Sequence, residues 1–151
     1  MSIAMLSLGL IDDDQALHTE ARRVVALVEV AQDEAVMQGR EFGVELMTSS
    51  YRFVEFDPYI SQWSELVGDD IFRLRRLPED MEFSLFLEGQ RVFLDDSSEQ
   101  NPAKSYAPHI LIFSSGDMSP FELHISQNAG EQTIVMRGNQ IGDLEIVRDE
   151  E

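Results

Sequence analysis

Residues that could carry out chemistry are few in this sequence, and they form no recognisable motif. The chain has no cysteine, which rules out a catalytic thiol, a disulfide and a thiolate metal site. No two histidines have zinc-site spacing, and no serine stands in a G-x-S-x-G element. Ser114 and Ser115, next to Gly116, come closest to a nucleophile, but this composition is typical of a turn. The three histidines are scattered, at His18, His109 and His124.

Acidic residues dominate the charge of the chain. It has 29 aspartates and glutamates against 11 lysines and arginines, and a formal net charge of -18. Such a surface opposes binding to the phosphates of nucleic acid and to anionic lipid headgroups. Acidic clusters at 12–14, 69–70, 95–96 and 149–151 offer oxygen ligands for calcium, but no EF-hand pattern is present. We interpret these clusters as solvated surface, so the sequence predicts no bound metal and no cofactor.

One short segment is rich in positive charge, with Arg73, Arg75 and Arg76 within four positions. The guanidinium fork can bind the carboxylates of an acidic partner. The interpretation that we favour is pairing with acids of the same chain.

Residues 14–39 are the only long stretch with helical periodicity. Charged residues fill much of the opposite face, and Gly39 is a suitable helix end because glycine adopts the left-handed conformation freely. This pattern predicts one amphipathic helix that buries an apolar stripe against the rest of the molecule. The stripe consists of Leu17, Ala21, Val24, Val25, Val28, Ala31 and Ala35.

The N-terminal residues 1–11 are almost wholly apolar and precede three aspartates at 12–14. They are too few to span a bilayer, which takes about 20 residues. Two interpretations stay open. The segment is an element packed on the core, with one aspartate as a helix N-cap. Otherwise it is the end of a longer hydrophobic helix, with the aspartates just outside the membrane.

The remainder of the chain reads as short strands joined by hairpin-length turns. Alternation of apolar and polar residues is clearest at 121–126. At 151 residues the chain is expected to form one domain, of the α+β class, with one long helix on an antiparallel body of two sheets. The predicted strands are 42–47, 51–56, 71–77, 83–87, 92–94, 109–113, 121–126, 133–137 and 144–147.

Three connections are predicted to be irregular. Residues 58–70 form a loop beneath which Trp63, the only tryptophan, is expected to plug the core. Residues 95–108 are expected to be an exposed, mobile loop, and 114–120 a tighter one.

Two separated stretches resemble the minor pseudopilin H family of type II secretion, which is grouped with FimT-like minor type IV pilins. The first is AQDEAVMQGREFG at 31–43, where the predicted helix meets the first strand. The second is FSSGDMSPFEL at 113–123, a serine-serine-glycine-acid turn followed by proline-phenylalanine. Leu77-Pro78 ahead of alternating strands also fits this resemblance.

The resemblance implies a type IV pilin-like fold and a structural subunit with no enzymatic activity. Such a subunit belongs to a short periplasmic filament that helps export folded proteins through an outer-membrane secretin. Members begin with a basic leader, a cleavage site and a hydrophobic helix, none of which is seen here. We therefore interpret residues 1–11 as the remnant of an inner-membrane anchor and 12–151 as a single periplasmic pseudopilin domain.

The implied partners are other minor and major pseudopilins, together with the secretin or a secreted substrate. Residues proposed to contact partners are Leu17, Val24, Val28, Arg73, Arg75, Trp63 and Tyr106.

Three alternatives to the secretion hypothesis stay open. A minor type IV pilin would serve pilus assembly or DNA uptake, but the acidic tail from Arg148 to Glu151 disfavours DNA. A periplasmic ligand-binding β domain would use Trp63 or Tyr106 as stacking platforms. A hydrolase would need a carboxylate pair with shifted pKa values in a cleft.

Overall fold

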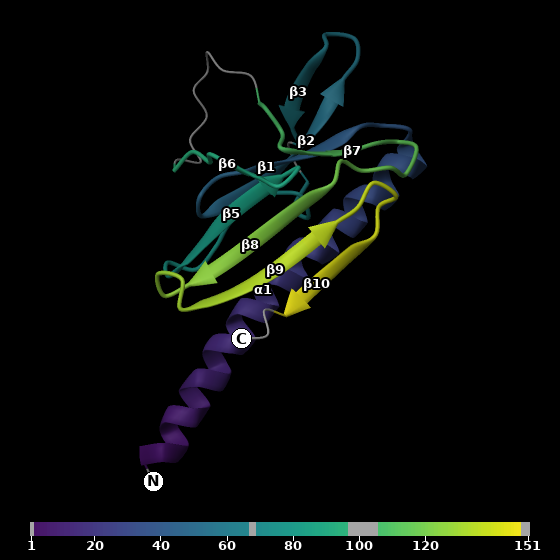
Figure 1. Ribbon diagram of the computed structural model, residues 1–151. Coiled ribbons are helices and arrows are strands. Elements are labelled where there is room, and N and C mark those ends of the chain that lie inside the picture. Colours follow the sequence, from purple (N-terminus) through teal and green to yellow (C-terminus); the bar gives the residue numbers. More distant parts are fainter. Residues whose placement is uncertain (1, 67–68, 97–105, 149–151) are drawn as a thin grey trace.

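The computed structural model, shown in Figure 1, describes the backbone of residues 2–66, 69–96 and 106–148. Within these residues, one helix, α1 (Ser2–Gln38), precedes ten strands. The helix is continuous through residues 12–14. No aspartate there acts as a helix N-cap, and the interpretation of one of them as an N-cap was wrong. Side chains in α1 are described from Gln15 onward.

Helix α1 ends as its sequence predicts. Gly39 has φ +64°, and the amide of Arg40 donates to the carbonyl of Ala35 at 3.1 Å. This is the six-residue hydrogen bond of a Schellman motif, which satisfies a carbonyl that the helix leaves free. The predicted apolar stripe is buried, apart from Val25, which is half-buried.

The strands form two antiparallel sheets, which confirms the predicted fold class. The first sheet has the order β3-β2-β1-β7, with β4 also paired to β2. Its strands are β1 (Phe42–Leu46), β2 (Ser50–Asp57), β3 (Gln62–Glu65), β4 (Arg75–Arg76) and β7 (Ile110–Ile112). The second sheet has the order β10-β9-β8-β5-β6. Its strands are β5 (Met81–Leu87), β6 (Gln90–Val92), β8 (Phe121–Gln127), β9 (Gln132–Gly138) and β10 (Leu144–Arg148).

Helix α1 packs against strands of both sheets, so the core lies between the helix and the β-body (Figure 1). Strand β8 alternates strictly between buried and half-buried positions, as predicted. Aromatic rings join the first sheet to the segment after β3, because Phe72 lies 5.1 Å from Phe53 and 6.0 Å from Phe42, centroid to centroid. Such pairs contribute about 0.5–1.5 kcal/mol beyond their burial.

Two predictions about the segment 58–77 were wrong. Part of the expected loop is strand β3, and the expected strand at 71–77 shrinks to the two residues of β4. Trp63 lies on β3, half-buried against the ring of Phe56 at 5.3 Å. It is not part of the hydrophobic core cluster, because β3 is an edge strand beyond the area that the helix covers.

Candidate functional site

The histidines lie in three different environments. His109 accepts a hydrogen bond at Nδ1 from the amide of Leu46 at 3.0 Å, and burial lowers its pKa. It therefore acts as a neutral structural acceptor. His124 Nε2 lies 2.7 Å from the carboxylate of Glu122 on the same strand, while His18 is on the helix. Within the described residues, no three His, Asp or Glu side chains are placed to hold a metal ion.

A hollow of about 660 Å³ borders Glu122 on the second sheet. Its walls include Phe86, Arg137 and Leu144. The carboxylate of Glu122 also accepts from Arg137 Nε at 2.9 Å. Hydrogen bonds from His124 first, and then from Arg137, lower the pKa of Glu122. A lowered pKa keeps this carboxylate ionised, whereas a general acid near neutral pH needs a raised one.

The two stretches that carry the family resemblance meet in space. Glu41, three residues past the last residue of α1, accepts a hydrogen bond from Ser114 Oγ at 2.8 Å and another from the Ser114 amide at 3.0 Å. The loop after β7 is closed further by a bond from the Gly116 amide to the carbonyl of Phe113 at 3.0 Å. Gly116 has φ +97°, a conformation that side chains other than glycine rarely adopt. We call this arrangement the Glu41–Ser114 clamp.

A second loop joins the same region. Gln32 on α1 donates to the carbonyl of Gly142 at 2.8 Å, and the amide of Met118 donates to the carbonyl of Gln140 at 3.0 Å. The C-terminal part of the helix is thus tied to the 114–120 loop and to the turn before β10. Beside these ties, Val36 and Ile141 are exposed apolar side chains.

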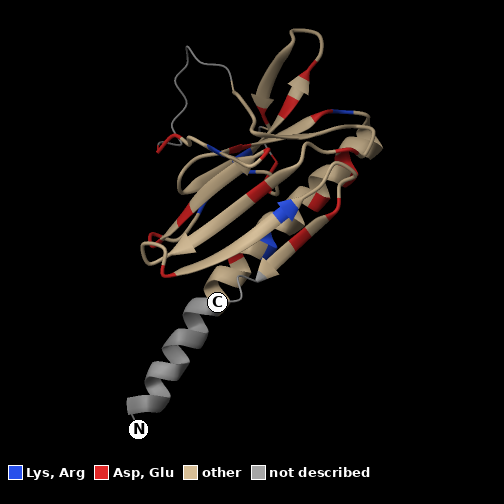
Figure 2. Cartoon of the chain, viewed as in Figure 1, with Lys and Arg blue, Asp and Glu red and all other residues tan. Residues whose placement is uncertain are grey.

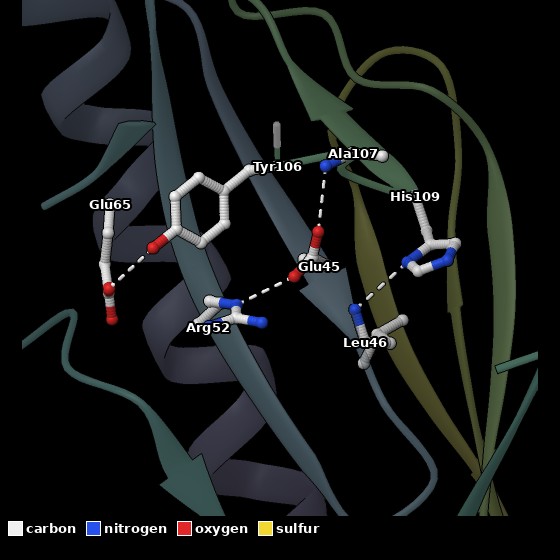
Figure 3. Close-up of polar contacts among 7 residues, drawn as sticks. All are labelled: Glu45, Leu46, Arg52, Glu65, Tyr106, Ala107 and His109. Atoms are coloured by element: carbon white, nitrogen blue, oxygen red, sulfur yellow. Dashed lines mark hydrogen bonds and ion pairs between the residues drawn. The ribbon is translucent and has the colours of Figure 1, made fainter. Parts of the chain in front are cut away.

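The outer face of the first sheet carries a polar network, shown in Figure 3. Arg52 Nε lies 2.7 Å from a Glu45 oxygen, and both side chains are largely buried. The other Glu45 oxygen accepts from the amide of Ala107 at 2.8 Å. The ring centroid of Tyr106 lies 4.9 Å from the guanidinium carbon of Arg52, and the Tyr106 hydroxyl donates to a carboxylate oxygen of Glu65 at 3.0 Å.

This network fixes the segment that leads into β7. Pro108 packs so closely over Gly43 that a Cβ there would lie 2.5 Å from the proline Cβ. Tyr106 is half-buried and serves the fold, and its hydroxyl is already bonded to Glu65. The prediction of an exposed loop at 95–108 fails at this end, and residues 97–105 lie outside the described residues.

The other residues predicted to contact partners lie either in the core or on the segment that includes β4. Leu17, Val24 and Val28 are at most 3% exposed, because they form the helix face that packs on the β-body, and their contact with partners stays a prediction. Arg73 and Arg75 donate to the backbone carbonyls of Asp70 and Ile71, each at 3.0 Å. In the part of the chain that the structure describes, neither has an acidic ion-pair partner, so the favoured pairing with the chain's own acids was wrong there.

Sequence reasoning missed two glutamates that organise these regions. Glu41 stood within the first resembling stretch without a role, and Glu45 was seen only as the polar position of an alternating strand. The signal at Glu41 was a glutamate two residues after the helix-ending glycine. Its partner is distant in sequence, so the pairing could not be derived from spacing.

A long N-terminal helix packed on two antiparallel sheets is the fold of the minor pseudopilins. The crystal structure of the minor pseudopilin EpsH from Vibrio cholerae superposes with a TM-score of 0.73 at 19% identity, covering 91% of this chain and 96% of that one. The solution structure of E. coli GspH gives a TM-score of 0.67 at 19% identity, covering 90% of each chain.

Sequence comparison gives the family within that class. The model of the family described as Type II transport protein GspH matches residues 20–142, and this chain belongs to that family. Type II secretion system protein H of Pseudomonas aeruginosa is 33% identical over 133 residues, covering 87% of this chain and 75% of that protein. The protein of the same name from Aeromonas hydrophila is 31% identical over 151 residues, covering 97% and 82%.

Proposed function

We propose that this chain is a minor pseudopilin, a structural subunit of the type II secretion pseudopilus that assists the export of folded proteins across the outer membrane. The observation that carries the proposal is the family match over residues 20–142. The fold shared with EpsH and GspH supports it. The Glu41–Ser114 clamp adds a physical reason for the two resembling stretches to occur together.

The proposed location is the inner membrane, with the β-body in the periplasm. Residues 1–11 would be part of the anchor helix and 12–151 the pseudopilin domain. Among the described residues, no helix is both long and apolar enough to cross a bilayer. The proposed partners are the other pseudopilins, and beyond them the secretin or a secreted substrate.

Acidity fits a filament subunit better than a DNA receptor. Figure 2 shows acidic positions on the helix and on both sheets, with few basic ones, and the net charge of -18 repels a phosphate polymer. A subunit held by neighbours requires no catalytic group, and the protein is proposed to act through assembly alone.

Gene deletion in the bacterium that encodes the chain tests this function. We expect type II substrates to accumulate in the periplasm of the deletion strain and to be secreted again when the gene is restored on a plasmid. DNA uptake and pilus-dependent motility are measured in the same strains. Normal secretion together with a loss of either of these would contradict the proposal and favour a minor type IV pilin.

A further inference from the structure

Three arginines in one short segment, Arg73, Arg75 and Arg76, form the densest group of basic residues in this acidic protein. Arg23, Arg40, Arg52 and Arg137 each pair with a glutamate. Within the described ranges, 2–66, 69–96 and 106–148, no carboxylate forms an ion pair with Arg73, Arg75 or Arg76. Arg22 and Arg91 also form no ion pair among the described residues, but only these three unpaired arginines are gathered in one segment of a chain with 29 acidic residues.

The core beneath the cluster does not neutralise it either. Arg75 lies directly opposite Tyr51 in the β2–β4 ladder, so both side chains are on the same face. The charges that act on the buried Tyr51 phenol come from Arg75, Glu20, Arg23 and Arg73. The one acid among them, Glu20, is held by Arg23 through Nη1 at 2.9 and 3.1 Å. Within the described residues, Arg75 forms no ion pair, and its buried Nε has no hydrogen-bond partner.

The surface around the cluster has the composition of a protein interface. Arg73 and Arg76 are exposed, and Ile71 in the same segment is 51% exposed. Arginine is enriched at contact surfaces between proteins, and an exposed apolar side chain gains from burial there. Strand β4 pairs with β2 alone, so this segment lies at the margin of the first sheet, where a neighbour can approach.

We propose that the surface formed by the exposed residues Ile71, Arg73 and Arg76 docks a carboxylate-bearing segment of a neighbouring pseudopilin. Charge complementarity is the argument for this occupant, because guanidinium groups bind carboxylates in a two-pronged geometry. A nucleic acid partner is disfavoured, since the molecule as a whole carries -18. This inference rests on the proposed function and assigns a surface and a partner chemistry to it.

Photo-cross-linking of the full-length chain in secreting cells tests the proposal. p-Benzoylphenylalanine replaces Ile71, and in a matched control it replaces Phe93, an exposed apolar residue just after β6 on the second sheet. We expect an adduct with another pseudopilin from position 71, with the cross-linked peptide containing aspartate or glutamate. No adduct at position 71 in cells that secrete normally, or an adduct only with nucleic acid, overturns the inference while leaving the proposed function intact.

Charge variants make the test specific to the arginines. The double variant Arg73→Gln/Arg76→Gln is expected to lower the adduct yield from position 71 about tenfold, since removing interfacial charges weakens complementary contacts. The control Arg40→Gln/Arg91→Gln removes the same charge elsewhere and is expected to leave the yield within about twofold. Equal yields from both double variants would show that the arginines do not hold the neighbour.

Discussion

The carboxylate of Glu41 holds Ser114 by two hydrogen bonds, one from the hydroxyl at 2.8 Å and one from the backbone amide at 3.0 Å. This relationship joins the end of the long helix to the loop after β7. The helix end and the loop are distant in sequence, and the chain brings them together only when β7 pairs with β1.

Truncating Glu41 is expected to destabilise the fold. Glu41→Ala removes both acceptors and should lower the free energy of unfolding by about 2–3 kcal/mol, because hydrogen bonds to a charged group are stronger than neutral ones. Ser114→Ala removes one donor and should cost about 1 kcal/mol. Urea unfolding followed by tryptophan fluorescence measures both.

A double-mutant cycle assigns this loss to the clamp. Glu41→Ala in the Ser114→Ala background should cost less than in the natural chain, because part of the interaction is already gone. Glu145→Ala, at an exposed position on β10, is the control and should change stability by less than about 0.5 kcal/mol. Strict additivity of the two clamp substitutions would contradict this prediction.

Arg52→Met should destabilise the protein more than Glu45→Gln does. Arg52 is the more buried of the two, with 7% of its side chain exposed against 14% for Glu45. Its loss leaves the Glu45 carboxylate without its cation and Tyr106 without the guanidinium stack. Breaking a buried pair from one side costs about 3–5 kcal/mol, and partial exposure puts our expectation at about 2–4 kcal/mol. Arg40→Met, which breaks an exposed pair, should cost under about 1 kcal/mol.

Stability should fall in mild acid because of His109. Burial lowers the pKa of His109 below its usual value, so below about pH 6.5 the unfolded chain binds a proton that the folded chain resists. The contribution is complete above that pH and is lost as the pH falls through the lowered pKa. His109→Gln keeps an acceptor for the Leu46 amide without this titration. Thermal unfolding from pH 8 to 5 should show a smaller loss for the variant, and identical slopes would refute the assignment.

Stability should also fall in strong alkali because of Tyr51. Burial raises the pKa of Tyr51 from 10.0 to about 12, so its contribution is complete below pH 10 and is lost as the pH rises toward that value. Tyr51→Phe should reduce the slope of stability against pH in this interval by up to about 1.4 kcal/mol per unit. Tyr59→Phe, at a 96% exposed position, is the control, and an equal change in both variants would contradict the prediction.

Periodicity predicted the elements that bury one side and expose the other. The stripe from Leu17 to Ala35 and the alternation of β8 were correct because their apolar spacing matches one helix face and one sheet face. Strand β3 was missed because the sequence QWSE has no apolar alternation and pairs only along an edge. Phe72 and Leu77 suggested a strand, but they are buried anchors of a segment that is mostly turn.

The site was harder to predict than the fold. Two stretches resemble one family, but the linear sequence does not show that Glu41 of the first binds Ser114 of the second. The pairing of Arg73 and Arg75 with acids was expected from the abundance of carboxylates, and abundance does not decide which charges the fold brings together. Trp63 was assigned to the core because of its size, whereas its strand lies at the edge of a sheet.

The ties at the C-terminal part of α1 have a mechanical consequence. A load applied along the helix axis reaches the β-body through the packed apolar stripe, the Gln32 bond to Gly142 and the Glu41–Ser114 clamp. These contacts are distributed along the helix, so the load acts on them in shear and they share it, instead of failing one after another as in peeling. We therefore expect the helix and the β-body to move together under an axial load.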